Sequence, residues 1–175
     1  MKLFIKILAG TIIVIVLLAG SIVVIGYRLP IAHTASRSIL LHQPPTKIYA
    51  TVRDFASGPS WNSDLKTVVV DQQPDGRIHF RETGTNGTVN YELVEDVPEQ
   101  KIVIRILDKD LGYSGKWTYK FAPEGSGTRV SITEDGEISN VIFRFASRYV
   151  FGQTGTMDSY LTALGGHFGE TVTPQ

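Results

Sequence analysis

Cysteine is absent from this chain of 175 residues, and neither sign of charge is in excess. The lack of cysteine excludes disulfides, thiolate nucleophiles and cysteine metal ligands, although a cysteine-free domain suits either redox compartment. Basic and acidic residues number 17 each, so the chain lacks the basic field that nucleic-acid binding requires. We therefore expect no nucleic-acid partner.

Motifs for metal, cofactor or nucleophilic chemistry are also missing. The chain has four histidines, and none has metal-ligand spacing. No acidic calcium loop is present, and the sequence "GSGTRV" lacks the third glycine of a dinucleotide-binding fingerprint. There is no G-x-S-x-G motif, and no nucleophile–base–orienter set can be assembled. The sequence thus predicts neither a metal nor a cofactor.

Long uncharged runs are absent except at the N-terminus, where "ILAGTIIVIVLLAGSIVVIGY" separates Lys6 from Arg28. A helix needs roughly 20 apolar residues to cross the hydrocarbon core of a bilayer, and a signal peptide usually has an apolar region of only about 7–15. We therefore expect residues 1–27 to form an uncleaved, single-pass membrane anchor. Lys2, Lys6 and the amino terminus slightly outweigh Arg28 and Arg37, which favours an extracytoplasmic domain.

A short segment, residues 28–35, is expected to link this anchor to a single domain over residues 36–170, with a tail at 171–175. Pro30 discourages continuation of the helix. Eight extended residues span at most roughly 3.3–3.6 Å each, which is less than a bilayer thickness. The domain is therefore expected to stay close to the membrane surface, either to exchange a ligand with it or only to be localised there.

The periodicity after residue 36 is typical of an α+β domain. Residues 36–42 and 66–72 read as strands, and residues 44–55 between them as a helix that breaks at Gly58-Pro59, just before Trp61. Five further runs alternate one apolar and one polar face, which predicts an antiparallel sheet covered on one side. These runs are residues 77–81, 89–93, 102–106, 113–121 and 129–133.

Helical spacing from residue 140 to residue 170 supplies the cover for the apolar face of the sheet. Asn140 or Ser139 is a suitable N-cap. Gly152 and Gly155 interrupt the pattern, and they would mark a break between two helices because each glycine inside a helix costs about 1 kcal/mol relative to alanine.

This order of elements resembles the START-like helix-grip proteins of the SRPBCC superfamily, specifically the polyketide cyclase/dehydrase and lipid-transport group. The resemblance rests on "ILLHQPPTKIYATVRDFASGPSWNSDL", on "GYSGKWTYKFAPEGSGTRVSITEDGEI" and on the terminal helical segment, and it covers roughly residues 36–170. It implies an antiparallel sheet that wraps around a long C-terminal helix and leaves a hydrophobic cavity between them. Trp61 would then lie at one wall of that cavity, or alternatively plug the end of a core.

The candidate cavity lining follows from the resemblance and from the alternation. Glu82 and Glu134 lie in phase with apolar neighbours, so each carboxyl would either face the cavity with a raised pKa or reach water at a strand end. The tyrosines could offer hydroxyls to a ligand or be plain core. The candidates are Trp61, Phe80, Glu82, Tyr91, Ile104, Trp117, Tyr119, Glu134, Tyr149 and Tyr160.

Three classes of function remain open at this point. Binding of an apolar or amphipathic small molecule, such as a lipid, is favoured because no catalytic constellation is visible. A cyclase or dehydratase would use Glu82 or Glu134 as its acid or base. A membrane-tethered interaction module would fill its interior with side chains and lack a pocket of a few hundred Å³.

Overall fold

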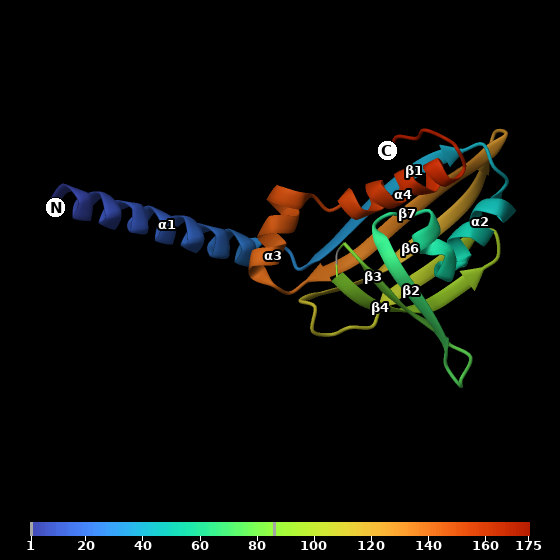
Figure 1. The fold of residues 1–175 in the computed structure, drawn as a ribbon, viewed down its shortest axis with the longest axis horizontal. Coiled ribbons are helices and arrows are strands. Elements are labelled where there is room, and N and C mark those ends of the chain that lie inside the picture. The colour runs from blue at the N-terminus through green and yellow to red at the C-terminus, as the bar shows by residue number, and fades with distance from the viewer. Residues whose placement is uncertain (1, 86) are drawn as a thin grey trace.

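A seven-stranded antiparallel sheet forms the body of the molecule, with strand order β1-β7-β6-β5-β4-β3-β2 (Figure 1). The structure is a computed structural model, and it describes residues 2–85 and 87–175. All five alternating runs and both other predicted strands lie in this sheet, which confirms the expected sheet. The strands are β1 (Ala32–Leu41), β2 (Leu65–Gln72), β3 (Ile78–Gly84), β4 (Gly87–Val97), β5 (Lys101–Ile106), β6 (Tyr113–Glu124) and β7 (Gly127–Ile138).

Helix α4 (Gly155–His167) covers one face of the sheet, as the helix-grip resemblance implies (Figure 1). Its apolar side is fully buried against the inward residues of the strands. At its N-terminal end, the Arg37 guanidinium of β1 bonds Asp158 at 2.9 Å and donates to the Thr154 hydroxyl at 3.1 Å, so charge pairing holds the helix onto the sheet. The fully buried large side chains of the core include Leu41, Ile48, Ile102, Ile132, Met157, Leu161 and Leu164.

Helix α2 (Pro45–Arg53) and the 3₁₀ helix η1 (Phe55–Ser60) form the connection from β1 to β2. The regular helix ends at Arg53, earlier than the expected end at residue 55, and Gly58-Pro59 lie inside the 3₁₀ turn rather than in a gap. A Cβ at Gly58 would come within 3.0 Å of the Leu65 side chain. The glycine thus allows the turn to lie against the start of β2.

The N-terminal helix α1 (Lys2–Arg28) projects from the body, and its most apolar stretch does not pack against the rest of the molecule (Figure 1). By length and composition it could cross a membrane. It meets the rest of the chain at helix α3 (Val141–Ala146), which continues as one π-helical turn, η2 (Ser147–Phe151). The Asn140 side chain accepts from the Phe143 amide at 2.9 Å, which confirms Asn140 as the N-cap.

The terminal helical segment is divided at Gly152, as the glycine pattern indicates, but only its second part covers the sheet. The first part, α3 and η2, packs beside the end of α1 instead (Figure 1). Ile142 and Tyr149 have exposed fractions of 61% and 60%, so the expectation that they cover the apolar face is wrong. Gly152 has φ 77°, a left-handed conformation that glycine adopts without strain, and it turns the chain toward α4.

Both ends of the predicted domain differ from the sequence boundaries. β1 begins at Ala32, so residues 32–35 of the expected linker lie in the sheet and pair with residues 134–137 of β7. The expected tail lies along the outer edge of β1, where Gln175 and Ser38 exchange two backbone hydrogen bonds of 2.9 and 3.0 Å. This pairing shields part of an edge strand.

Candidate functional site

A cavity of about 770 Å³ lies between the sheet and the segment from α3 to the start of α4. A smaller hollow of about 110 Å³ adjoins it, and Tyr91, Ile104 and Trp117 line both. Strands β4, β5 and β6 supply these three side chains, because every second residue of each strand points toward the concave face. Side chains therefore leave a hollow beside the packed core, and its volume is within the range of roughly 300–1,000 Å³ that ligand pockets have.

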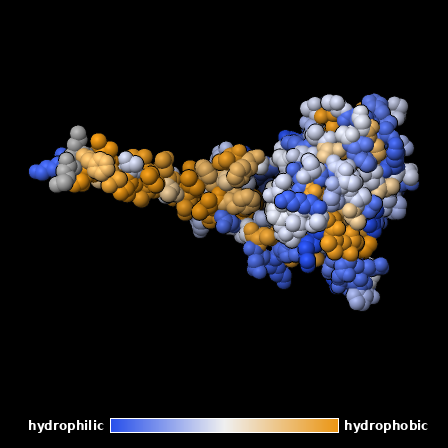
Figure 2. All heavy atoms as spheres, in the orientation of Figure 1, coloured by the Kyte–Doolittle hydropathy of each residue, from blue (hydrophilic) through white to orange (hydrophobic). Residues whose placement is uncertain are grey.

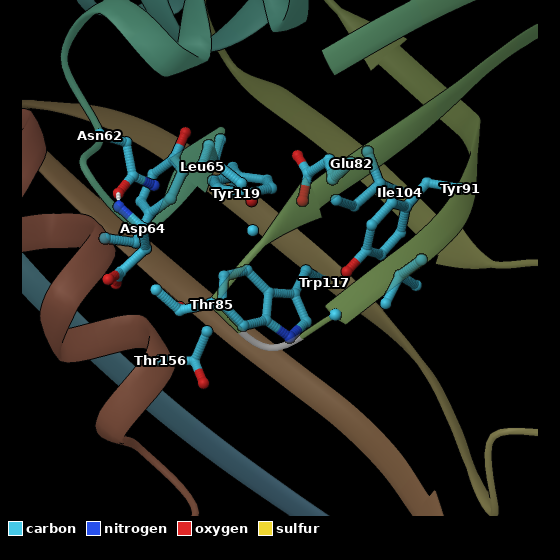
Figure 3. A pocket seen from close by; sticks show the side chains of 14 residues that line it. Asn62, Asp64, Leu65, Glu82, Thr85, Tyr91, Ile104, Trp117, Tyr119 and Thr156 are labelled. Atoms are coloured by element: carbon cyan, nitrogen blue, oxygen red, sulfur yellow. Dashed lines mark hydrogen bonds between the residues drawn. The ribbon is translucent and has the colours of Figure 1, made fainter. Parts of the chain in front are cut away.

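Seven of the ten sequence candidates line this pair of hollows. Tyr91, Ile104 and Trp117 line both hollows. In addition, Glu82, Tyr119 and Tyr160 line the smaller one and Glu134 lines the larger one. Figure 3 shows Glu82, Tyr91, Trp117 and Tyr119 around the same opening.

The other three candidates lie elsewhere. Trp61 lines neither hollow and packs against Tyr160, with the two ring centres 5.3 Å apart. Its Nε1 is buried and has no hydrogen-bond partner in the described part of the chain. Phe80 is core, stacked between Phe55 and Tyr91. Tyr149 is exposed on η2 and lines neither hollow, which corrects the expectation for this residue.

Glu82 provides a partly buried ionisable group in the smaller hollow. Its cross-strand neighbours are Val68 on β2 and Val89 on β4. Within residues 2–85 and 87–175 its carboxyl has neither a hydrogen-bond partner nor a salt bridge. Burial raises the pKa of Glu82 from 4.5 to about 7. The carboxyl can therefore give up or accept a proton near neutral pH, or donate a hydrogen bond to a ligand while it is neutral.

The phenols around Glu82 are held in their neutral form. Burial, followed by the nearby Glu82 carboxyl, raises the pKa of Tyr91, and the same two causes raise the pKa of Tyr160. The rings of Tyr119 and Tyr160 lie 5.5 Å apart. These hydroxyls can donate hydrogen bonds to a ligand, but they cannot act as bases at ordinary pH.

A second polar group lies on the wall of the larger hollow. Trp117 Nε1 donates to Glu134 Oε2 at 3.0 Å, and His33 Nε2 lies 3.4 Å from Glu134 Oε1. Gly136 makes room for the histidine, since a Cβ there would come within 2.5 Å of His33 Cε1. Glu134 thus orients Trp117 and His33 along the cavity wall.

His33 is a lining residue that sequence reasoning missed, because it was assigned to the linker. It is in phase with Ile39 and Leu41, which are buried on β1. Extension of that two-residue period toward the N-terminus would have placed His33 on the inner face. Among the described residues no group of His, Asp or Glu side chains is arranged to hold a metal ion.

Solved structures with the same fold include three informative relatives. Zhui aromatase/cyclase from Streptomyces sp. R1128 is 10% identical over 78% of this chain and 93% of its own, with a TM-score of 0.62. A START superfamily protein from Mycobacterium smegmatis is 16% identical over 77% of this chain and 96% of its own, with a TM-score of 0.59.

The di-domain ARO/CYC protein StfQ of the steffimycin biosynthetic pathway is 16% identical over 77% of this chain, with a TM-score of 0.60. This chain covers only 50% of StfQ, or about half of its length. At these identities the likeness establishes the fold alone.

The family description is more direct. No curated protein matches the chain significantly in sequence. The family described as "Polyketide cyclase / dehydrase and lipid transport" matches residues 32–165, which are most of the chain and begin where β1 begins. The match ends within α4 and so includes the sheet and most of the helix that the sheet holds. The chain is a member of this polyketide cyclase/dehydrase and lipid-transport family, with the helix-grip fold of the START superfamily.

Proposed function

We propose that the protein is a membrane-anchored binding domain that holds an apolar or amphipathic small molecule, such as a lipid, in the cavity between its sheet and its terminal helices. The observation that carries this proposal is the cavity of about 770 Å³, whose lining exposes more apolar than polar surface. Polar side chains, among them Asp64, Glu134 and Glu137, also line it and could orient the polar end of a ligand. The unfilled interior counts against an interaction module with a packed core.

Membrane anchoring is supported by α1 and by its attachment to the domain. A stretch of 25 residues, Phe4–Arg28, is long and apolar enough to span a bilayer. Arg144 is only 7% exposed. It donates to the carbonyl of Gly26 in the last turn of α1 and to that of Leu29 just after the helix. Cleavage as a signal peptide would remove Gly26 or leave this buried guanidinium with fewer acceptors, which is unfavourable. Lys2 and Lys6 favour the domain on the extracytoplasmic side.

Native mass spectrometry of full-length protein from carbonate-washed membranes tests both parts of the proposal. We expect the protein to stay with the washed membranes and to carry a bound apolar molecule. Thr156→Trp should reduce occupancy because Thr156 lines the cavity at the start of α4. Thr162→Trp is the matched control, since Thr162 lies on the same helix, is exposed and lines neither hollow.

Two results would count against the proposal. Full-length protein released into the soluble fraction would contradict anchoring. Protein without a bound molecule, or with equal occupancy in the two tryptophan variants, would contradict binding in this cavity.

Acid–base catalysis on a bound apolar substrate is the second candidate function. The pKa of about 7 for the unpaired Glu82 carboxyl favours it, because an acid or base works best when its pKa is near the operating pH. For an enzyme, Glu82→Gln should accumulate bound substrate, so the mass of the bound compound would differ from that in the parent protein. For a simple binder the same compound should be found in both proteins.

A further inference from the structure

The segment 141–151, which comprises α3 and η2 and is called here the rim segment, exposes an unusual amount of apolar side chain. Val150 and Phe151 have exposed fractions of 65% and 68%, and Ile142, Phe143 and Tyr149 are exposed as well. Figure 2 shows that the apolar surface of α1 continues onto the part of the body beside the end of that helix. An exposed apolar patch of this kind marks an interaction surface, and its place beside a membrane-type helix indicates lipid.

The rim segment is fixed to α1 by backbone contacts rather than by a flexible connection. A Cβ at Gly26 would come within 2.3 Å of the Val141 carbonyl oxygen, so glycine is what allows the two helices to touch. The Arg144 guanidinium then donates to four carbonyls, those of Gly26, Leu29, Ile138 and Ser139, at 2.9–3.2 Å. A bilayer that holds α1 therefore also determines where the rim segment lies.

The charges of the rim segment fit the headgroup layer. No acidic residue occurs between residues 138 and 157. Arg148 is exposed, so its guanidinium is free to reach lipid phosphates. Tyr27 and Tyr149 are both exposed, and tyrosine is enriched at the boundary between headgroups and acyl chains.

The same segment also forms one side of the cavity. Phe143, Ser147 and Phe151 line the larger hollow, opposite Tyr113 and Ile138 of the sheet. The cavity therefore reaches the surface at the part of the body that contacts α1, and its edge there is aromatic.

We propose that the rim segment lies in the interfacial layer of the bilayer that α1 spans, so that the cavity opens onto the acyl chains and takes its ligand from the bilayer itself. This inference rests on the proposed function, since it names the source of the ligand and its chemical class: a membrane lipid with an acyl chain. The ligand enters sideways between Phe151 and the sheet, without passing through bulk water.

The absence of cysteine makes a direct test possible, because a single introduced cysteine can be labelled alone. Val150→Cys probes the rim segment, and Val69→Cys on β2 is the matched control, since the two valines have exposed fractions of 65% and 60%. Each full-length variant is labelled with an environment-sensitive fluorophore and placed in nanodiscs of phosphatidylcholine and phosphatidylglycerol. Quenching by spin-labelled lipid is compared with quenching by aqueous iodide.

We expect the label at position 150 to be quenched by the lipid probe and protected from iodide, and the label at position 69 to behave in the opposite way. A label at position 150 that is as accessible to iodide as the one at position 69 overturns the inference. If bound lipid is found in that protein, the inference fails while the proposed function stands. If position 150 is embedded but no molecule is bound, insertion of the rim segment is supported and the proposed function fails.

Discussion

At the scale of single residues, the raised pKa of Glu82 is a direct consequence of its surroundings. Val68 and Val89 flank it across the strands, and the groups that face it are the phenols of Tyr91, Tyr119 and Tyr160. None of these supplies a positive charge, so burial is the only cause that raises its pKa to about 7. An ionised Glu82 is therefore costly in the folded protein but not in the unfolded chain.

Glu82→Gln should change how stability depends on pH. The folded protein keeps the Glu82 proton up to about pH 7, while an unfolded glutamate loses it near 4.5. The folded state thus binds more protons between these values, and stability falls as pH rises through this window, by roughly 3 kcal/mol at most. In thermal unfolding in detergent, the midpoint of the variant should rise relative to that of the parent protein as the pH rises from 5 to 8.

Glu99→Gln, in an exposed turn, is the control and should retain the pH dependence of the parent protein. A difference between Glu82→Gln and the parent that stays constant across this pH range would show that burial does not perturb Glu82.

Alternation predicted the inward position of Glu82 and Glu134 but not their environments. The sequence allowed each carboxyl either to face the cavity or to reach water at the end of its strand. In the structure Glu82 lines the smaller hollow and Glu134 the larger one. The contact of Glu134 with Trp117 and His33 depends on strand pairing and on the small size of Gly136, neither of which is visible in a local pattern. For Trp61 the sequence left two positions open, a cavity wall or the end of the core, because a tryptophan after a helix break has the same local pattern in both; the structure packs it against the core.

At the scale of secondary-structure elements, the contact between α1 and α3 is the feature that the sequence concealed. Ile142, Phe145 and Tyr149 have helical spacing, and such a stripe predicts an apolar face without saying what covers it. The sheet was the obvious partner, but α3 packs on α1 instead. The strands were predictable because period-2 alternation requires one buried face, whereas residues 32–35 are small or polar and gave no strand signal.

Gly26→Ala should weaken this contact. The added methyl group would meet a backbone oxygen at 2.3 Å, and a backbone oxygen cannot move aside as a flexible side chain could. The expected loss of stability is about 1–3 kcal/mol, which is typical of overpacking. Faster cleavage by trypsin after Arg28, together with a lower thermal midpoint in detergent, would report it.

Gly20→Ala is the matched control, since nothing lies within 4 Å of the Cβ position at residue 20 of the same helix. If Gly26→Ala and Gly20→Ala give the same cleavage rate and midpoint, α1 and α3 do not pack closely.

At the scale of the whole molecule, helix α1 and the cavity-bearing domain are joined closely. The sequence predicted an eight-residue linker, but only residues 29–31 separate α1 from β1, and they span at most roughly 10 Å. The buried Arg144 attaches the end of α1 to the rim segment. With α1 in a bilayer, as proposed, a domain held in this way would exchange a ligand with that bilayer and would not travel between distant membranes.

The two tryptophans of the chain test the central claim, lipid in the cavity, most directly. Trp117 lines both hollows, whereas Trp61 packs behind the wall. Full-length Trp61→Phe and Trp117→Phe proteins, each left with one tryptophan, are placed in nanodiscs that contain lipids brominated on the acyl chain. Because bromine quenches indole only at close range, we predict strong quenching of Trp117 in the first protein and little quenching of Trp61 in the second. Equal quenching of the two tryptophans, or none of Trp117, would contradict an acyl chain in this cavity.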